Sequence, residues 1–158
     1  CKITDVSSLN IVYSQGAHAM CSGAKSLKKF GNILIAGGGS LAQAFYTCTA
    51  LTSIGTITVA AGTKYDLTFY QASALTDITF AGTIGKSIDM QHSPLSKESI
   101  ESIINHLSAS TTGQTLTLKK TAVNAAFGID VDDSTTYPEG SEYYVLRHSK
   151  DNWTISYI

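Results

Sequence analysis

The sequence predicts a mixed α/β fold in which short parallel strands are stacked in the successive coils of an open solenoid, with a more helical unit at the C-terminal end. Three observations lead to this fold class. Apolar residues recur at a constant offset, a second apolar template recurs at less regular spacing, and helix signals gather after residue 95. At 158 residues the chain has the length of one ordinary domain.

A constant 24-residue offset relates the first set of apolar residues, and repeats of this length are typical of solenoids. Each copy begins with an apolar residue that is followed by three more at fixed positions. The copies are Ile3, Val6, Leu9 and Ile11; Leu27, Phe30, Ile33 and Ile35; Leu51, Ile54, Ile57 and Val59; and a fading fourth copy of Leu75, Ile78, Ala81 and Thr83.

The second template is apolar at positions 1, 3 and 8 and small at position 6. Its clearest copies begin at Leu67, Ile88 and Leu116, and weaker ones begin at Ala19 and Gln43. Alternation at positions 1 and 3 predicts a short strand with one buried face. We therefore expect strands centred on residues 45, 69, 90 and 118, whose unequal spacing is absorbed in the loops.

The stretch from Ala44 to Ile54 resembles the A-F-x-x-C-x-x-L-x-x-I unit of BspA-like leucine-rich repeats, which occur in bacterial surface proteins and phage tail proteins. The resemblance covers about residues 3–125, although Cys48 is replaced by Ala24 and Ala72 in other copies. Residues 93–155 are also similar to a closing module of phage-tail and gut-bacterial repeat proteins. The resemblance implies a leucine-rich-repeat solenoid of five or six coils that acts in surface recognition.

The C-terminal part has its own helix and strand signals. Ser96 is expected to cap a helix, in which the apolar residues up to Leu107 would fall on one face. A short helix is expected over 122–127, a loop over 128–140, a helix over 142–150 and a strand over 153–157. We assign 1–127 to the repeats, with longer units from residue 88, and 128–158 to a capping unit.

No comparable cap is visible at the other end, where the first copy starts at Ile3. We therefore expect further repeats or another domain to precede this chain in a longer protein, or a homo-oligomeric contact at this end. Cys1 is compatible with a fragment, a processed terminus or a lipidated terminus.

Composition excludes several classes of function. Eleven Lys and Arg against twelve Asp and Glu give a net charge of −1, which argues against nucleic acid as a partner. No apolar run approaches the roughly 20 residues of a membrane-spanning helix. The four His and three Cys form no zinc-ligand spacing, and no catalytic triad motif is present. We predict no enzyme, no cofactor and no metal.

Two segments have alternative interpretations. Gly37-Gly38-Gly39-Ser40-Leu41-Ala42 follows an apolar run and matches the dinucleotide-binding G-x-G-x-x-A pattern, but a recurring turn of the solenoid is favoured. The acidic residues between 130 and 139 offer oxygen ligands for calcium without the spacing of an EF-hand, so a solvated turn is favoured.

The predicted site is the outward ladder of the second template, because side chains about 4.8 Å apart on stacked strands form one surface. Tyrosine is common in recognition surfaces. We expect an extracellular module, on a bacterial cell surface or a virion, that binds a cell-surface glycan or protein; a structural assembly module of a phage tail or surface layer is the alternative. The candidate ligand-binding residues are Tyr46, Thr68, Tyr70, Asp89, Gln91, His92, Thr117 and Lys119.

Overall fold

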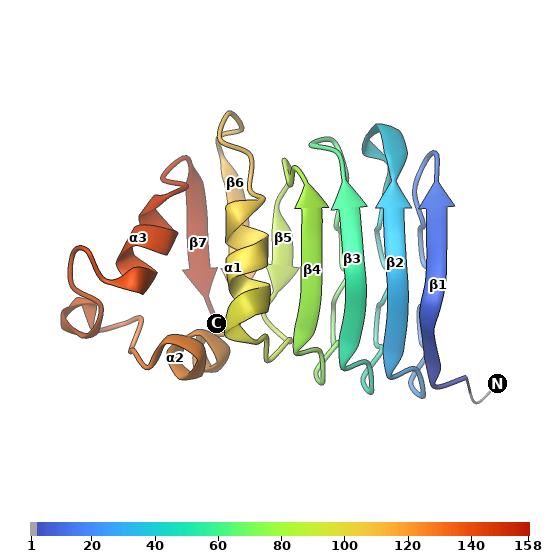
Figure 1. The fold of residues 1–158 in the computed structure, drawn as a ribbon, viewed down its shortest axis with the longest axis horizontal. Coiled ribbons are helices and arrows are strands. Elements are labelled where there is room, and N and C mark those ends of the chain that lie inside the picture. Colours follow the sequence, from blue (N-terminus) through green and yellow to red (C-terminus); the bar gives the residue numbers. More distant parts are fainter. Residues whose placement is uncertain (1–2) are drawn as a thin grey trace.

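The computed structural model describes residues 3–158 as a mixed α/β fold with two parallel sheets. Strands β1 to β4 lie side by side in one sheet, and β5, β6 and β7 form the second (Figure 1). The elements are β1 (Asp5–Tyr13), β2 (Lys29–Ile35), β3 (Ser53–Val59), β4 (Asp77–Gly82), β5 (Ile88–Met90), α1 (Lys97–Asn105), β6 (Gln114–Leu118), α2 (Lys120–Phe127), α3 (Glu142–His148) and β7 (Trp153–Tyr157), with short 3-10 turns at 36–38 and 134–136.

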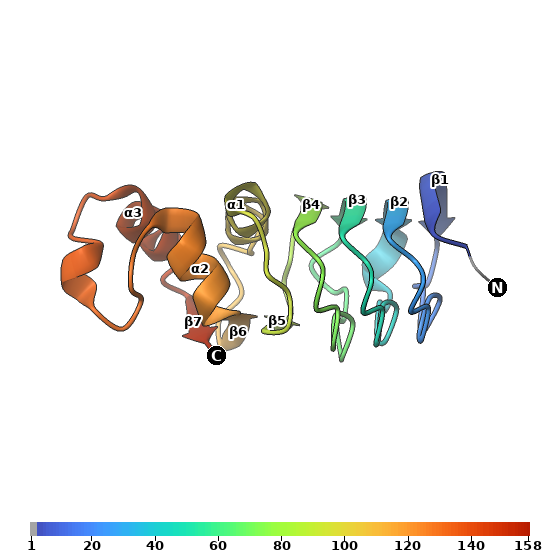
Figure 2. The same cartoon turned by 90° about the horizontal axis from the view of Figure 1, so that it is seen from below.

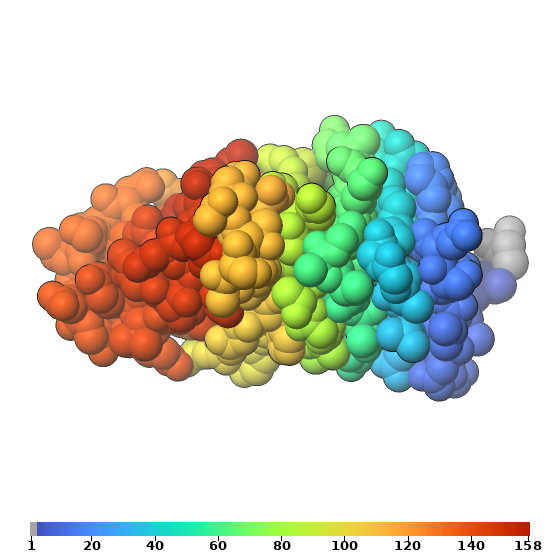
Figure 3. All heavy atoms as spheres, turned by 90° about the horizontal axis from the view of Figure 1, so that it is seen from above, coloured from blue at the N-terminus to red at the C-terminus, as the bar shows by residue number. Residues whose placement is uncertain are grey.

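The molecule has two long sides. Seen from below, β1 to β4 and then α1 and α3 occupy one side, while the turns between the strands and then β5 to β7 occupy the other (Figure 2). The space-filling view shows the chain running along the long axis in consecutive bands (Figure 3). Each strand with its following turn is therefore a layer that contacts mainly the layers before and after it.

The 24-residue offset sets the pairing between β2 and β3. Lys29 pairs with Ser53 and Ile33 with Ile57, both at this offset. Within β2 the buried residues are Phe30, Gly31, Ile33 and Ile35, so its apolar side chains point into the space between the two sides of the molecule. The periodic apolar residues of the second and third copies thus lie in the core, as the sequence predicted, whereas Ile3 and Leu9 of the first copy are 55% and 43% exposed.

The constant offset holds at the start of the first and fourth copies and fails further along both strands. A bulge between Val6 and Asn10 makes Ile11 pair with Ile33, where the sequence pattern had aligned it with Ile35. Between β3 and β4 the register slips by one residue, and Phe80 pairs with Ile57. The fourth copy is therefore one residue shorter and keeps an aromatic core residue where the fixed offset had found Ala81.

The prediction of strands centred on residues 45 and 69 is wrong. Residues 42–47 and 66–71 are turns, because Gln43, Thr47, Leu67 and Gln71 have φ between 53° and 57°, in the left-handed region. An apolar pair at positions 1 and 3 is compatible with either geometry. The strands expected at 90 and 118 are confirmed as β5 and β6, which pair in parallel with Ile88 opposite Leu116.

Aromatic residues fill the middle of the core. The Phe45 and Phe69 rings stack with centroids 6.1 Å apart, and Phe30 meets Phe45 edge-on at 5.2 Å. All three side chains are at most 4% exposed. Successive layers are therefore held together by apolar contact as well as by backbone hydrogen bonds.

Helix α1 takes the position beside β4 that a fifth strand would take. The amides of Ile78 and Phe80 donate to the hydroxyl oxygens of Ser99 and Ser102, both at 2.9 Å. The predicted cap is confirmed, since the Ser96 hydroxyl accepts from the Ser99 amide. The helix thus ends the first sheet by satisfying backbone groups of its last strand.

The C-terminal elements largely match the prediction. Helix α2 begins two residues earlier than expected, α3 ends at His148 with a turn after it, and β7 spans 153–157 as expected. Strand β7 pairs with β6 throughout its length. The indole Nε1 of Trp153 donates to the Ser108 carbonyl at 2.9 Å, which fixes the last strand against the loop that follows α1.

Candidate functional site

Turns from successive layers form a continuous ladder on the side opposite β1 to β4 (Figure 2). The Phe45 amide donates to the Thr68 carbonyl at 3.0 Å, and the Thr47 amide donates to the Tyr70 carbonyl at 2.8 Å. Strands β5 to β7 continue this side of the molecule. We call it the turn-ladder face, and it consists of residues 18–23, 42–47, 66–71, 88–92 and 114–119 with β7.

Three of the predicted residues form an aromatic row on this face. The Tyr46 and Tyr70 rings stack 5.3 Å apart at an angle of 13°, and His92 meets Tyr70 edge-on at 4.8 Å. All three side chains are half-buried. The Nε2 atom of His92 is buried and has no hydrogen-bond partner among residues 3–158, so this imidazole contributes packing to the row.

The geometry of the stack determines what the row presents. Two rings stacked along the ladder cover each other's faces, so the solvent side of the row carries ring edges and phenol hydroxyls. Such edges offer hydrogen-bond donors and acceptors together with a small apolar area. The row is therefore better suited to hydrogen bonding along its length than to stacking a planar group on each ring.

A polar row lies beside the aromatic one. Asp89 accepts from the Gln91 backbone amide at 2.9 Å and from its Nε2 at 2.7 Å, which holds both side chains together. Asp89 pairs with Thr117, and Thr117 pairs with Ser156. Ser156 extends this polar row but was not among the predicted site residues. Its position in the strand expected over 153–157 is the sequence feature that could have identified it.

Lys119 lies at the C-terminal end of β6, directly before α2, and is half-buried. Strand β5 ends at Met90 opposite Leu118, so Gln91 and Lys119 both follow the ends of paired strands. The face thus runs from aromatic at Tyr46 to polar and charged at Lys119.

Thr68 does not belong to the site. Its side chain is 1% exposed, and its hydroxyl donates to the Leu41 carbonyl at 2.9 Å. The left-handed conformation of Leu67 shifts the alternation, so that Leu67 is 49% exposed and Thr68 points inward. The inference that Thr68 faces solvent is wrong because it assumed strand geometry.

The glycine run does not have the geometry of a dinucleotide site. Residues 36–38 form a short 3-10 turn and residues 42–47 a further turn, where a dinucleotide site requires a helix. A Cβ built on Gly38 would lie 3.1 Å from the Cα of Gly62, the equivalent position of the next layer. The run is a turn in which neighbouring layers approach closely.

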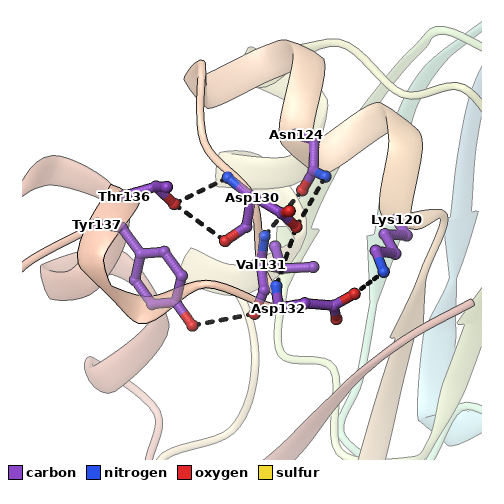
Figure 4. A network of polar contacts seen from close by, with 7 residues as sticks. All are labelled: Lys120, Asn124, Asp130, Val131, Asp132, Thr136 and Tyr137. Carbon is purple, nitrogen blue, oxygen red and sulfur yellow. Dashed lines mark hydrogen bonds and ion pairs between the residues drawn. The ribbon is translucent and has the colours of Figure 1, made fainter.

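The acidic loop uses its carboxylates within its own structure (Figure 4). Asp132 is paired with Lys120, and an Asp130 carboxylate oxygen accepts from the Asp132 amide at 3.1 Å. The Thr136 hydroxyl bonds to both the amide and the carbonyl of Asp130, at 2.8 and 2.9 Å. Throughout the described part of the chain, no three His, Cys, Asp or Glu side chains gather in a group that could hold a metal ion.

The two described cysteines lie in or near the core. Cys48 is fully buried, its thiol donates to the Cys21 carbonyl at 3.0 Å, and burial raises its pKa to about 11. Burial also raises the pKa of the half-buried Cys21. A thiol with a raised pKa is a poor nucleophile at neutral pH.

No protein-family model, curated protein or solved structure matches this chain. The resemblance to BspA-like repeats therefore depends on the residues and spacings quoted above. In addition, none of the helices within residues 3–158 has both the length and the apolar character needed to cross a membrane.

Proposed function

We propose that this chain is a recognition module that binds a glycan or a protein on a cell surface through the turn-ladder face. The observation that carries the proposal is the row of Tyr46, Tyr70 and His92, which joins three layers into one half-exposed aromatic strip. A core aromatic stack already exists at Phe45 and Phe69, so the outer row is not needed to fill the interior.

We also propose that the fold is a leucine-rich-repeat solenoid of the BspA-like type. In support, β2 and β3 pair at the 24-residue offset, and the turns after them pair as well, with the Phe45 amide bonded to Thr68 and the Gln43 amide bonded to Asp66. An open array of this kind presents an extended surface, which repeat proteins use for binding.

The composition of the face favours a ligand rich in hydroxyl or amide groups. Tyr46 and Tyr70 present hydroxyls, Gln91 presents an amide, and only Asp89 and Lys119 carry charge among the candidates. A glycan or an uncharged protein surface matches these groups better than a polyanion does. The proposed location is extracellular, on a bacterial surface or a virion.

The first prediction tests this surface directly. Replacing both tyrosines (Tyr46→Ala with Tyr70→Ala) is expected to weaken binding to bacterial cells or to an immobilised glycan panel by at least tenfold, because truncating central aromatic residues typically costs more than about 1 kcal/mol each. Binding is measured by cell pull-down and by surface plasmon resonance against the panel.

The matched control is Tyr144→Ala, because Tyr144 is also half-buried and packs on a histidine, His148, at 4.3 Å, but lies in α3. The control is expected to bind as the unmodified chain does. If the double variant has an unchanged circular dichroism spectrum and binds as tightly as the unmodified chain, the recognition proposal is contradicted.

The second candidate function is structural assembly in a phage tail or surface layer. It is favoured by the apolar end of the stack at β1, where Ile3, Leu9 and Val12 are 55%, 43% and 69% exposed. A protein that only assembles would tolerate both tyrosine substitutions and would lose its partner when this end is altered.

A further inference from the structure

The turn-ladder face carries an outward aromatic or polar side chain in each of five successive layers. Tyr46 and Tyr70 stack in the first two of these layers, and the layer of β5 follows with Asp89. Thr117 and Ser156 come next, because Asp89 pairs with Thr117 and Thr117 pairs with Ser156. These groups therefore form a strip that crosses the layers along one long side of the molecule (Figure 2).

The strip repeats at the thickness of one layer. The ring centroids of Tyr46 and Tyr70 are 5.3 Å apart, and those of Tyr70 and His92 are 4.8 Å apart. An extended peptide advances by about 3.3 Å per residue, so its side chains fall out of step with the layers. One ring of a linear sugar chain is about as long as one layer is thick, so such a chain stays in step with the strip.

The backbone of this face is already used between the layers. The Cys21 amide donates to the Ala44 carbonyl at 2.8 Å, and the Phe45 amide donates to the Thr68 carbonyl at 3.0 Å. A peptide that binds by strand addition needs free backbone donors and acceptors, which these turns do not offer. A ligand on this face is therefore held by side chains, whose hydroxyl, amide and carboxylate groups match sugar hydroxyls.

Charge on the face favours an uncharged ligand. Within the ranges that define the turn-ladder face, the charged side chains are Asp66, Asp89 and Lys119. Two carboxylates and one ammonium group give no attraction for a polyanion. The Asp89 carboxylate holds Gln91 in place and still has lone pairs for a ligand hydroxyl, which would form a charge-assisted hydrogen bond.

We propose that the turn-ladder face binds an uncharged linear polysaccharide that lies across the layers, with one sugar opposite each layer from Tyr46 to Ser156. The proposal rests on the recognition function proposed above and specifies its ligand. The ring edges of Tyr46 and Tyr70 contact the C–H groups of the sugars at one end of the strip, and their hydroxyls bond to sugar hydroxyls. Asp89, Thr117 and Ser156 bind the hydroxyls of the following sugars.

The first test is the dependence of affinity on ligand length. The 158-residue chain is titrated with cello-, manno- and N-acetylated chito-oligosaccharides of one to eight sugars by isothermal titration calorimetry. In the series that binds, the association constant is expected to rise about two- to tenfold with each sugar, the effect of one net hydrogen bond. It is expected to level off when five layers are covered. No binding in any series, or an affinity that does not depend on length, would overturn the proposal.

The second test uses variants at the two ends of the strip. Tyr46→Ala and Ser156→Ala are each expected to shorten by one sugar the length at which the affinity levels off, because each removes the group opposite a terminal sugar. The matched control is Thr58→Ala, since Thr58 is half-buried and lies in β3 on the opposite side of the molecule. It is expected to behave as the unmodified chain does. An unchanged length profile in both end variants would contradict the proposed path of the ligand.

A cell-binding measurement separates failure of this proposal from failure of the recognition function. The longest oligosaccharide that binds is expected to compete with bacterial cells for the chain, and protease treatment of the cells is expected to leave binding unchanged. If protease treatment abolishes binding that depends on Tyr46 and Tyr70, the face recognises a protein and the polysaccharide proposal is overturned. If the two tyrosines do not affect cell binding, the recognition function itself is contradicted.

Discussion

At the scale of single residues, hydroxyl groups connect several layers to the one before them. The Thr52 hydroxyl donates to the Lys28 carbonyl at 2.9 Å, and the Thr76 hydroxyl donates to the Thr52 carbonyl at 3.2 Å. Deeper in the molecule, the Ser93 hydroxyl donates to the Ala72 carbonyl. The 19 Ser and 19 Thr of the chain thus include many that satisfy backbone carbonyls between layers, in addition to those exposed to solvent.

Cys48 gives a prediction at the same scale. Burial raises its pKa to about 11, whereas an unfolded thiol ionises near 9, so the folded state keeps this proton as pH rises between the two values. Because the folded state binds more protons there, the free energy of unfolding is expected to fall from pH 9 to 11. Urea denaturation of the unmodified chain and of Cys48→Ala at each pH measures this, and the variant is expected to show the weaker dependence. An identical pH dependence in both would contradict the assignment.

At the scale of elements, α1 decides where the first sheet ends. Without it, β4 would expose amides along its outer edge, and exposed edges invite pairing with other chains. The hydroxyl oxygens of Ser99 and Ser102 each accept a hydrogen bond from one of these amides. The Ser99 hydroxyl also donates to the Thr76 carbonyl at 3.0 Å. A helix therefore closes a sheet through its side chains.

Removing these hydroxyls tests the role of α1. Ser99→Ala with Ser102→Ala is expected to lower the free energy of unfolding by about 1–3 kcal/mol for each buried amide left without an acceptor. Guanidinium denaturation provides the measurement, and Ser73→Ala, at an exposed turn position, is the control that is expected to stay within about 0.5 kcal/mol. A double variant as stable as the control would show that water replaces the hydroxyls.

At the scale of the whole molecule, stability depends on neighbouring layers. Among the described residues, strands β2 and β3 each lie between two strands, while β1 has a neighbouring strand on one side only. Amide hydrogen exchange is therefore expected to be slowest in β2 and β3 and faster in β1, because an end layer opens without disturbing the others.

The exchange rates are measured amide by amide on the 158-residue chain under native conditions. Uniform protection of β1, β2 and β3 would contradict this prediction, because it would show that the stack opens as one unit.

The sequence by itself predicted much of the site. Tyr46 and Tyr70 are related by the 24-residue offset, and this offset holds in the turns at 42–47 and 66–71, so the two residues occupy equivalent positions in successive layers. The same reasoning holds for the buried residues Phe45 and Phe69. The helix at 97–105 was also predictable, because its capping serine and apolar face are local signals.

Only the tertiary structure decided which side chains face outward. Thr68 is buried and Leu67 exposed because the turn at 66–71 has left-handed residues, and nothing in the apolar pattern distinguishes such a turn from a strand. The bulge in β1 and the one-residue slip at β4 are likewise seen only in the pairing between layers. A period in the sequence indicates which residues are equivalent wherever the register between layers holds. The orientation of those residues depends on backbone conformation, which neighbouring layers select through packing and hydrogen bonding.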